Sequence, residues 1–399
     1  MIETRESGTA AMELGGTQPM TLPESAGELA EAVVDHAALA ANVRTLRSAA
    51  GTQLMAVVKA DAFGHGAAPV ARTCLAAGAT WLGVTRVSEA LELRRSGVGA
   101  PILAWLFDPA RSAEAVAAGV DLSVSSPADL AAVARVSGAP RIHLKLDTGL
   151  HRSGCPGEDW SRLVSVAASL ESAGRVRVAG IWSHLSHGGR PDAVPTHRQL
   201  LMFRVGLDLA RAAGLRPEVV HLANTAAVQA NARDTAYDLV RVGAGVYGIG
   251  EGLRPALTLR TRVVQVRRVA AGRGVGYDHV GRTTRDTHLA LVPVGYADGL
   301  PRAATGRASI WVGGRRAPLI GRVCMDQVVA DLGPEPVAVG TEVVVLGPGD
   351  HGEPTARDWA AWSGTNEHEI YTGIGSRVGR RHVGADWAVD RSSNGREQS

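Results

Sequence analysis

Residues 54–66 read LMAVVKADAFGHG, an apolar run of five residues followed by a lysine and a loop of small residues. Such a run is typical of a strand buried on both faces, as in a parallel sheet. Lys59 would stand at the end of that strand. Only Lys59 and Lys145 are lysines, although lysine and arginine together number 42. Arginine stays protonated, so only lysine can supply a neutral amine or form an imine. We therefore expect chemical roles for both lysines, the alternative being that biased composition alone left them.

Units like this one repeat as far as residue 248. Strand-like runs alternate with stretches whose apolar residues have helical spacing and which often end in glycine. The runs are 54–59, 81–86, 101–106, 121–126, 142–148, 178–185, 219–225 and 238–248. Eight strand–helix units over roughly 200 residues predict a (β/α)₈ TIM-like barrel. An open, doubly wound sheet is the alternative.

The pattern changes after about residue 258 to period-2 runs separated by glycine-rich turns, which predicts a mainly antiparallel β domain. One helix is expected near 355–364. The expected organisation is a disordered leader (1–28), a barrel domain that binds the cofactor (29–258), a C-terminal β domain (259–388) and a disordered tail (389–399).

Composition excludes several classes of function. The net charge is +3 with no basic block, which argues against a nucleic-acid partner. No apolar run approaches the roughly 18 residues of a membrane span, and no secretory signal is evident. The three cysteines are scattered and odd in number, which indicates free thiols in a cytoplasmic protein.

Polar residues at the carboxyl ends of barrel strands point into the active site. This rule collects a cationic set with one hydroxyl residue: Lys59, Lys145 with Asp147 and Arg152, His184, Asn224 with Thr225, and Arg241. A cationic pocket with an amine nucleophile suits an anionic aldehyde cofactor, pyridoxal 5′-phosphate (PLP). Gly243, Ala244 and Gly245 could offer backbone N–H groups to its phosphate. Zinc at His184 and His187 is the alternative, but no third ligand is evident, so we expect no metal.

Eight motifs in order resemble those of bacterial alanine racemases. They are AVVKADAFGHG, KLDTGLHRSG, GIWSHL, HLANTAA, DLVRVGAGVYG, GVGYD, VPVGYADGLPR and GRVCMDQ, and they span about residues 32–380. The resemblance implies PLP as cofactor, an amino-acid substrate, and a head-to-tail homodimer whose two subunits share each active site.

The resemblance also implies roles for single residues. Lys59 would bind PLP and act as one base, and Tyr277 from the other subunit would be the base on the opposite face. Arg241 would face the pyridine nitrogen, and His184 would bridge Arg241 and Tyr277. The remaining cofactor positions are Phe63, Arg152, Asn224, Thr225, Gly243, Ala244 and His368. The substrate would meet Arg152, Met325 and Asp326, with Tyr296 and Arg302 at the entrance, and Lys145 matches a position that is often carbamylated.

General chemistry agrees with these roles. Racemisation removes a proton from one face of Cα and delivers another to the opposite face, so two bases must flank the substrate. An arginine at the pyridine nitrogen keeps its own proton and leaves the nitrogen unprotonated. The ring is then a weaker electron sink, which favours fidelity over rate.

The chain departs from the family pattern at four positions. Phe63 and His368 stand where the family usually has tyrosines whose hydroxyls reach the phosphate, so we expect the chain to hold PLP less tightly than relatives with both tyrosines. Gly276 replaces a serine before the catalytic tyrosine, and Asp278 replaces a glycine after it. None of these changes removes a group that transfers protons.

The leading hypothesis is a PLP-dependent alanine racemase that supplies D-alanine for peptidoglycan. One alternative is an amino-acid racemase of broader specificity. Another is a homologue with little turnover that binds PLP or D-cycloserine.

Overall fold

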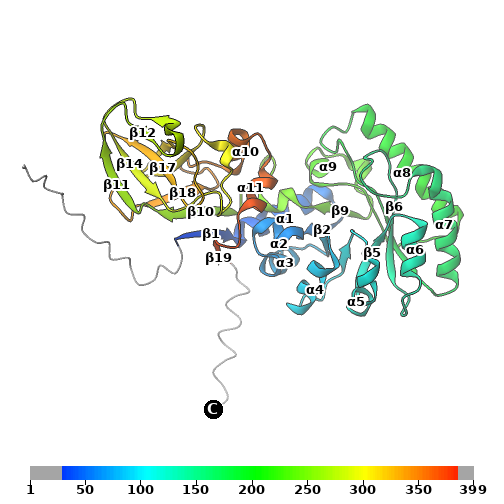
Figure 1. Cartoon of the computed structure of the whole chain (residues 1–399). Helices are drawn as coiled ribbons and strands as arrows, with labels where there is room; N and C mark the ends of the chain where they lie inside the picture. Colours follow the sequence, from blue (N-terminus) through cyan, green and yellow to red (C-terminus); the bar gives the residue numbers. More distant parts are fainter. Residues whose placement is uncertain (1–28, 385–399) are drawn as a thin grey trace, which may run out of the picture.

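The computed structural model describes residues 29–384. Its larger domain is built around a ring of eight parallel strands (Figure 1). Neighbouring strands in the ring follow the order β8-β7-β6-β5-β4-β3-β2-β9. The strands are β2 (Gln53–Val57), β3 (Trp81–Val84), β4 (Ile102–Ala104), β5 (Val120–Val124), β6 (Arg141–Lys145), β7 (Arg177–Trp182), β8 (Val219–His221) and β9 (Leu239–Val242). Each falls on one of the eight runs expected from the sequence.

Backbone contacts between β8 and β9 bring the two ends of this sheet together. Asp238 N donates to Val220 O at 3.1 Å, and Arg241 N donates to Ala223 O at 3.0 Å. An isolated parallel bridge pairs Asn224 with Arg241. The barrel prediction is therefore confirmed, and the open-sheet alternative is wrong.

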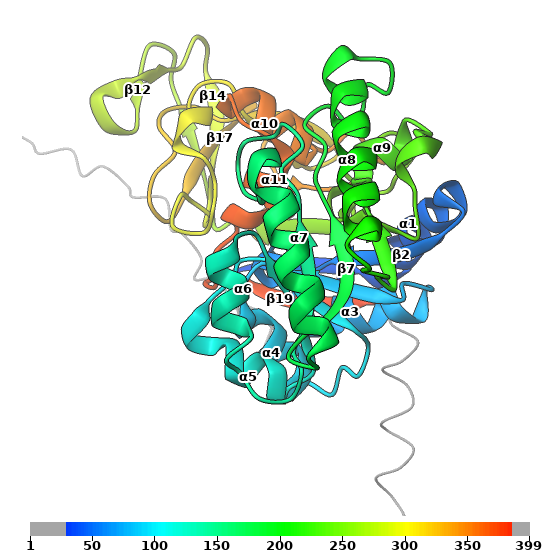
Figure 2. The ribbon, with the colours of Figure 1, turned by 90° about the vertical axis from the view of Figure 1, so that its right-hand side faces the viewer.

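Helices surround the ring (Figures 1 and 2). They are α1 (His36–Ala50), α2 (Lys59–Gly64), α3 (Ala67–Ala76), α4 (Val87–Arg95), α5 (Ser112–Ala117), α6 (Pro127–Val133), α7 (Gly157–Ser172), α8 (Val194–Ala212) and α9 (Thr225–Gln229). Short 3₁₀ turns are η1 (Pro109–Arg111), η2 (Arg233–Thr235) and η3 (Ala244–Tyr247). Close packing depends on small residues: a Cβ at Gly206 of α8 would lie 2.4 Å from Leu146 Cδ2, and Gly206 O accepts from Trp160 Nε1 of α7 at 2.8 Å.

The second domain contains three mostly antiparallel sheets. A six-stranded sheet has the order β16-β15-β18-β10-β1-β19, a three-stranded sheet has β11-β14-β17, and β12 pairs with β13. The strands are β10 (Leu257–Arg262), β11 (Gln265–Val269), β12 (Gly274–Val275), β13 (Gly281–Arg282), β14 (Thr287–Val292), β15 (Ser309–Val312), β16 (Arg315–Pro318), β17 (Val328–Gly333) and β18 (Glu342–Leu346). The helical segments are η4 (Tyr277–His279), η5 (Arg302–Ala304), α10 (Ala356–Ser363) and α11 (Glu367–Gly373).

The two ends of the described chain meet in the six-stranded sheet. β1 (Ala30–Asp35) lies antiparallel to β10 and parallel to β19 (Gly379–Val383). The strand that precedes the barrel thus pairs with strands of the second domain. The predicted helix near 355–364 is α10, whereas β1, β19 and α11 were not predicted.

The expected domain limits stay predictions. The expected leader (1–28) and tail (389–399) lie outside the described residues, as do residues 385–388 of the expected β domain. No helix within residues 29–384 combines the length and the apolar character needed to cross a membrane.

Candidate active site

The cationic residues expected at the strand ends gather at one mouth of the barrel. Lys59 directly follows the β2 region, Lys145 ends β6, His184 lies just beyond β7, and Arg241 belongs to β9. Arg241 Nη2 lies 3.1 Å from His184 Nδ1, and Arg241 and Lys145 both lie over the Trp182 ring, with Cζ and Nζ 4.7 and 4.4 Å from its centroid. The pKa of His184 is lowered to about 3 by burial first, and then by Arg241, Arg152, Lys145 and Lys59. His184 is therefore a neutral imidazole at neutral pH.

The Lys59 amine is partly buried in this cationic set. Its Nζ lies 5.8 Å from the centroid of the Trp105 ring. Burial lowers the pKa of Lys59, the positive charge of Arg152 lowers it further, and Glu89 opposes the change. A lowered pKa increases the fraction of neutral amine, which is the form that attacks a carbonyl carbon.

Lys145 is more deeply buried than Lys59, with 4% of its surface exposed. Its Nζ lies 4.4 Å from the Trp182 ring and donates to Ser153 Oγ. Burial, followed by Arg241 and Arg152, lowers the pKa of Lys145 to about 8. A sizeable neutral fraction at slightly alkaline pH is the state that carbamylation by carbon dioxide requires.

Arg241 is a buried guanidinium held by four acceptors. Nη2 donates to Ser183 O at 2.8 Å, Leu222 O at 3.2 Å and His184 Nδ1 at 3.1 Å, while Nη1 donates to a second histidine. Burial lowers its pKa to about 9. Because Arg241 donates to His184 Nδ1, the His184 proton resides on Nε2, where it is free to be donated onward.

Two histidines beneath Arg241 were not predicted as part of the site. Arg241 Nη1 lies 3.1 Å from His221 Nδ1, His221 Nε2 lies 2.9 Å from His143 Nδ1, and His143 Nε2 lies 3.2 Å from Asp121 Oδ2. Since arginine can only donate, the proton order along this chain of contacts is fixed from Arg241 to Asp121. The sequence signal was polar residues inside otherwise apolar strands, such as His143 in IHLK.

Backbone N–H groups and one hydroxyl form a further part of the mouth. Thr225 Oγ1 accepts from Gly243 N at 3.1 Å and from Gly245 N at 3.4 Å. Asn224 caps α9 by accepting from Ala227 N at 3.1 Å. Ala244 follows as the first residue of η3.

Phe63 and His368, the two departures from the family pattern, contact each other at this end. Their ring centroids are 5.6 Å apart, and Phe63 also stacks on Tyr247 at 4.5 Å. A Cβ at Gly243 would lie 3.4 Å from Phe63 Cζ. Burial lowers the pKa of His368, and Lys59 contributes in the same direction. Phe63, Gly243, His368 and Lys59 therefore border the same region.

The other predicted residues form a separate group on the β domain. Tyr277 in η4 is 71% exposed, Met325 53% and Tyr296 40%. Tyr296 N donates to Cys324 O at 2.9 Å, which brings Tyr296 close to Met325. Asp326 pairs with Arg377 at 2.8 Å. Arg302, also exposed, lies in η5.

Figures 1 and 2 both place β12, which leads directly to Tyr277, at the end of the β domain remote from the barrel. Within one chain, η4, which follows β12 and begins with Tyr277, therefore lies on the side of the β domain away from α2, which begins with Lys59. The two predicted bases thus belong to separate groups of residues, Lys59 to the group at the barrel mouth and Tyr277 to the group on the β domain.

The residues at the barrel mouth fit PLP chemically. Lys59 provides an amine with a lowered pKa, Arg241 a buried cation, and Arg152 a second cation. Thr225 Oγ1 accepts from Gly243 N and Gly245 N, so its own hydroxyl proton is left to donate to a phosphate. Among residues 29–384, no group of three or more His, Cys, Asp or Glu side chains could hold a metal ion.

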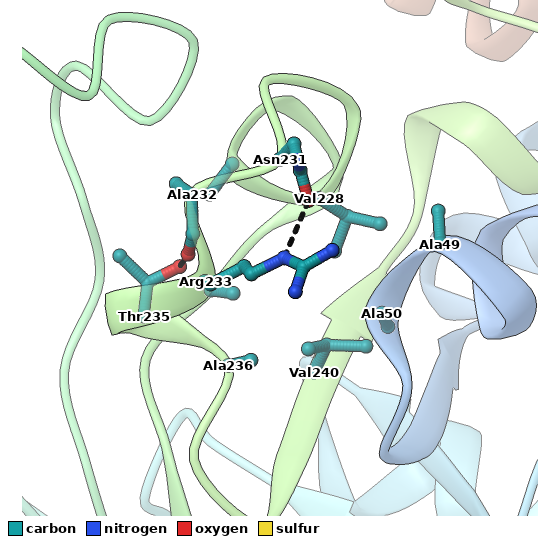
Figure 3. A pocket seen from close by; sticks show the side chains of 11 residues that line it. Ala49, Ala50, Val228, Asn231, Ala232, Arg233, Thr235, Ala236 and Val240 are labelled. Carbon is teal, nitrogen blue, oxygen red and sulfur yellow. Dashed lines mark hydrogen bonds between the residues drawn. The ribbon is translucent and has the colours of Figure 1, made fainter.

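The pocket in Figure 3 lies elsewhere, between the end of α1 and the α9–η2 segment. It is lined mostly by alanine and valine, and Arg233 Nε bonds Asn231 Oδ1 there at 3.4 Å. It includes none of the predicted site residues and no nucleophile paired with a base, so it is not the reaction site.

The buried neutral state of His184 makes the protein sensitive to acid. A group whose folded pKa (about 3) lies below its unfolded pKa (about 6.5) stabilises the fold fully above pH 6.5 and loses that contribution as pH falls. The His184→Asn variant keeps an acceptor for Arg241 but cannot titrate. Between about pH 6.5 and about pH 4.5, wild type should lose roughly 2 kcal/mol more free energy of unfolding than this variant does. Urea unfolding at both pH values measures the difference, and equal losses would show that His184 is not kept neutral.

Known proteins resemble the chain along most of its length. The family model for the alanine racemase N-terminal domain matches residues 34–251, and the model for the C-terminal domain matches residues 256–382. An alanine racemase of Salinispora arenicola is 49% identical over 367 residues, which cover 89% of this chain and 98% of the relative.

Solved structures agree with the family models. The alanine racemase from D-cycloserine producing Streptomyces lavendulae has a TM-score of 0.88 and 44% identity, covering 90% of this chain and 98% of that one. A Bartonella henselae alanine racemase with covalently bound pyridoxal phosphate has a TM-score of 0.81 and 26% identity, covering 89% and 99% of the two chains.

Proposed function

This chain belongs to the alanine racemase family, and from that premise we propose that it interconverts L- and D-alanine with two bases drawn from two subunits. The observation that carries the proposal is the division of the site. Lys59 lies at the barrel mouth of one chain, whereas Tyr277 is exposed on the β domain far from it. A second copy that brings its β domain to the barrel mouth would complete the site.

Lys59 is the group that holds PLP and serves as the first base. When bound, PLP withdraws electrons from the substrate Cα and so makes its proton acidic. Burial and Arg152 favour the neutral form of the Lys59 amine, which is the form that accepts a proton. The covalently bound pyridoxal phosphate of the Bartonella henselae relative supports the same attachment here.

Tyr277 of the partner subunit is the second base, on the opposite face of the substrate. Its side chain is 71% exposed in the single chain, which supports a role at a contact between subunits. His184 keeps its proton on Nε2 because Nδ1 accepts from Arg241. That proton is available to hydrogen-bond the phenolic oxygen and hold it in place.

Arg241 is the group that would hold the pyridine nitrogen of PLP. It remains a hydrogen-bond donor even with a pKa lowered to about 9. His221 accepts from Nη1, and Ser183 O and Leu222 O accept from Nη2, so contacts within the barrel fix the position of the guanidinium. A guanidinium that keeps its own proton would leave that nitrogen unprotonated and so limit side reactions.

The remaining residues position the two charged ends of the ligands. The phosphate would be held by Thr225, Gly243, Ala244 and His368, with Phe63 packed beside them. Asn224 would lie near the Arg241–His184 network, consistent with its parallel bridge to Arg241.

The substrate carboxylate would meet Arg152 and, from the partner subunit, Met325 and Asp326, with Tyr296 at the entrance. Carbamylated Lys145 would orient Arg152, consistent with a lowered pKa of about 8 for Lys145. The product D-alanine would enter peptidoglycan synthesis in the cytoplasm.

Progress curves from pure L-alanine and from pure D-alanine test the proposal. Because enantiomers have equal free energy, both reactions should converge on the same equal mixture, measured by chiral chromatography. Serine run in parallel reports whether specificity is broader. Protein that carries bound PLP yet converts neither enantiomer would contradict the proposal and favour the homologue with little turnover.

A further inference from the structure

Lys59 is followed by a left-handed turn built without glycine. Ala60, Asp61, Ala62 and Phe63 all have φ between 51° and 55° and ψ between 36° and 52°. Non-glycine residues in this conformation cost about 1–2 kcal/mol each, because Cβ approaches the following carbonyl oxygen. Four in succession make this segment strained, and such strain persists only where surrounding contacts hold it.

Glu89 is one of those contacts, and it acts on the residue next to Lys59. Its Oε1 accepts from Ala60 N at 2.7 Å. Its Oε2 accepts from Thr85 N at 2.8 Å and from Arg86 N at 2.9 Å. One carboxylate therefore joins the first N–H of the strained turn to the loop between β3 and α4. Bonds to an ionised acceptor are the stronger class of hydrogen bond.

We propose that Glu89 is a positioning residue for Lys59, holding the lysine where it meets PLP by fixing the entry to the left-handed turn. The inference rests on the proposed attachment of PLP to Lys59. Glu89 reaches the lysine through the backbone of Ala60.

The carboxylate is required because both of its oxygens are acceptors. A glutamine at this position has one acceptor oxygen and an amide NH₂ that only donates. It can serve either Ala60 N or the N–H groups of Thr85 and Arg86, but not both. The substitution Glu89→Gln therefore breaks the connection while it keeps side-chain volume and a residue type that suits the third position of a helix.

Asp129 supplies a matched control two strand–helix units farther along. It is the third residue of α6, as Glu89 is the third residue of α4. Its Oδ2 accepts from Ser125 N at 3.0 Å, four residues earlier, just as Glu89 accepts from Thr85 N. Asp129→Asn thus weakens an equivalent helix start and leaves the Lys59 turn alone.

The experiment measures how fast added PLP becomes attached to apoprotein. The readout is absorbance at about 420 nm, a property of the lysine-linked cofactor, together with the mass of the protein after borohydride reduction. Wild type, Glu89→Gln, Glu89→Ala and Asp129→Asn are compared across about pH 7 to about pH 10. Thermal unfolding of each apoprotein shows whether it is folded.

The pH profile separates position from charge. Four charged or titratable groups interact with Lys59. Glu89 is the one that stabilises the protonated amine and so raises the Lys59 pKa, whereas Arg152, His184 and His368 do not stabilise it. Loss of the Glu89 charge should therefore move the rise in rate to lower pH. Loss of positioning should instead lower the plateau, which is the maximal rate reached once the amine is neutral.

We expect the plateau rate of Glu89→Gln to be about tenfold to a hundredfold below wild type, since small misplacement of a reacting group has effects of that size. The plateau rate of Asp129→Asn should equal that of wild type, even if its thermal midpoint falls as far as that of Glu89→Gln. An unchanged plateau in Glu89→Gln, or an equal fall in Asp129→Asn, would overturn the proposal. If wild type itself failed to attach PLP, the proposed function would fail instead, so the two failures are distinguishable.

Discussion

Replacing Lys59 with arginine is expected to abolish both the attached cofactor and racemisation. A guanidinium stays protonated and cannot form a covalent link to an aldehyde. The absorbance band at about 420 nm should disappear. Turnover should fall about a thousandfold or more, because one base and the residue that anchors the cofactor are lost together. Absorbance spectra and chiral chromatography of the purified variant measure both effects.

The two-lysine composition provides the control. Lys145→Arg leaves Lys59 as the only lysine of the chain. This variant should keep the band, because the side chain of Lys145 points to Ser153 and Trp182 and has its own proposed role. A band that persists in Lys59→Arg and vanishes in Lys145→Arg would reverse the assignment.

The barrel was predictable because its strands carry a simple local signal. Runs such as 54–59 and 178–185 are short, apolar and bounded by polar or small residues. The strands β2 and β7 each begin one residue before these runs and end inside them. The carboxyl ends of parallel strands meet at one mouth, so a list of strand-end residues was also a list of neighbours. Lys59, His184 and Arg241 were found in this way.

The conformation around Lys59 was not predictable. A left-handed backbone conformation is usually signalled in the sequence by glycine or asparagine, and Ala60–Phe63 contains neither. The turn is held by contacts from distant parts of the sequence: Glu89 binds Ala60 N, and Arg380 donates to Gly64 O at 2.9 Å. These contacts span 29 and 316 residues of the sequence, so they leave no local pattern.

The pairing of β1 with β19 escaped prediction for the same reason. The β19 sequence GRRHV has neither alternation nor an apolar run. Its strand conformation depends on β1, which lies near the other end of the chain. The histidines below Arg241 were missed because His143 and His221 sit inside apolar strands, where they read as ordinary core residues.

A mixture of two inactive variants is expected to regain activity if each active site is shared. Lys59→Ala removes the base at the barrel mouth, and Tyr277→Phe removes the phenol on the β domain. In a mixed dimer, one site combines the two altered residues, and the other combines intact Lys59 with intact Tyr277 of the partner subunit. Random exchange makes half of all dimers mixed, so about a quarter of all sites should be intact under two-fold symmetry.

The measurement is alanine racemisation after equal amounts of the two variants have been mixed and subunit exchange has been demonstrated by mass spectrometry of differently tagged chains. Each variant alone should show almost no turnover. The mixture is predicted to reach about a quarter of wild-type turnover per site, as follows from two-fold pairing. Exchange without any recovery of activity would contradict the shared site, because Lys59 and Tyr277 would then have to act within one chain.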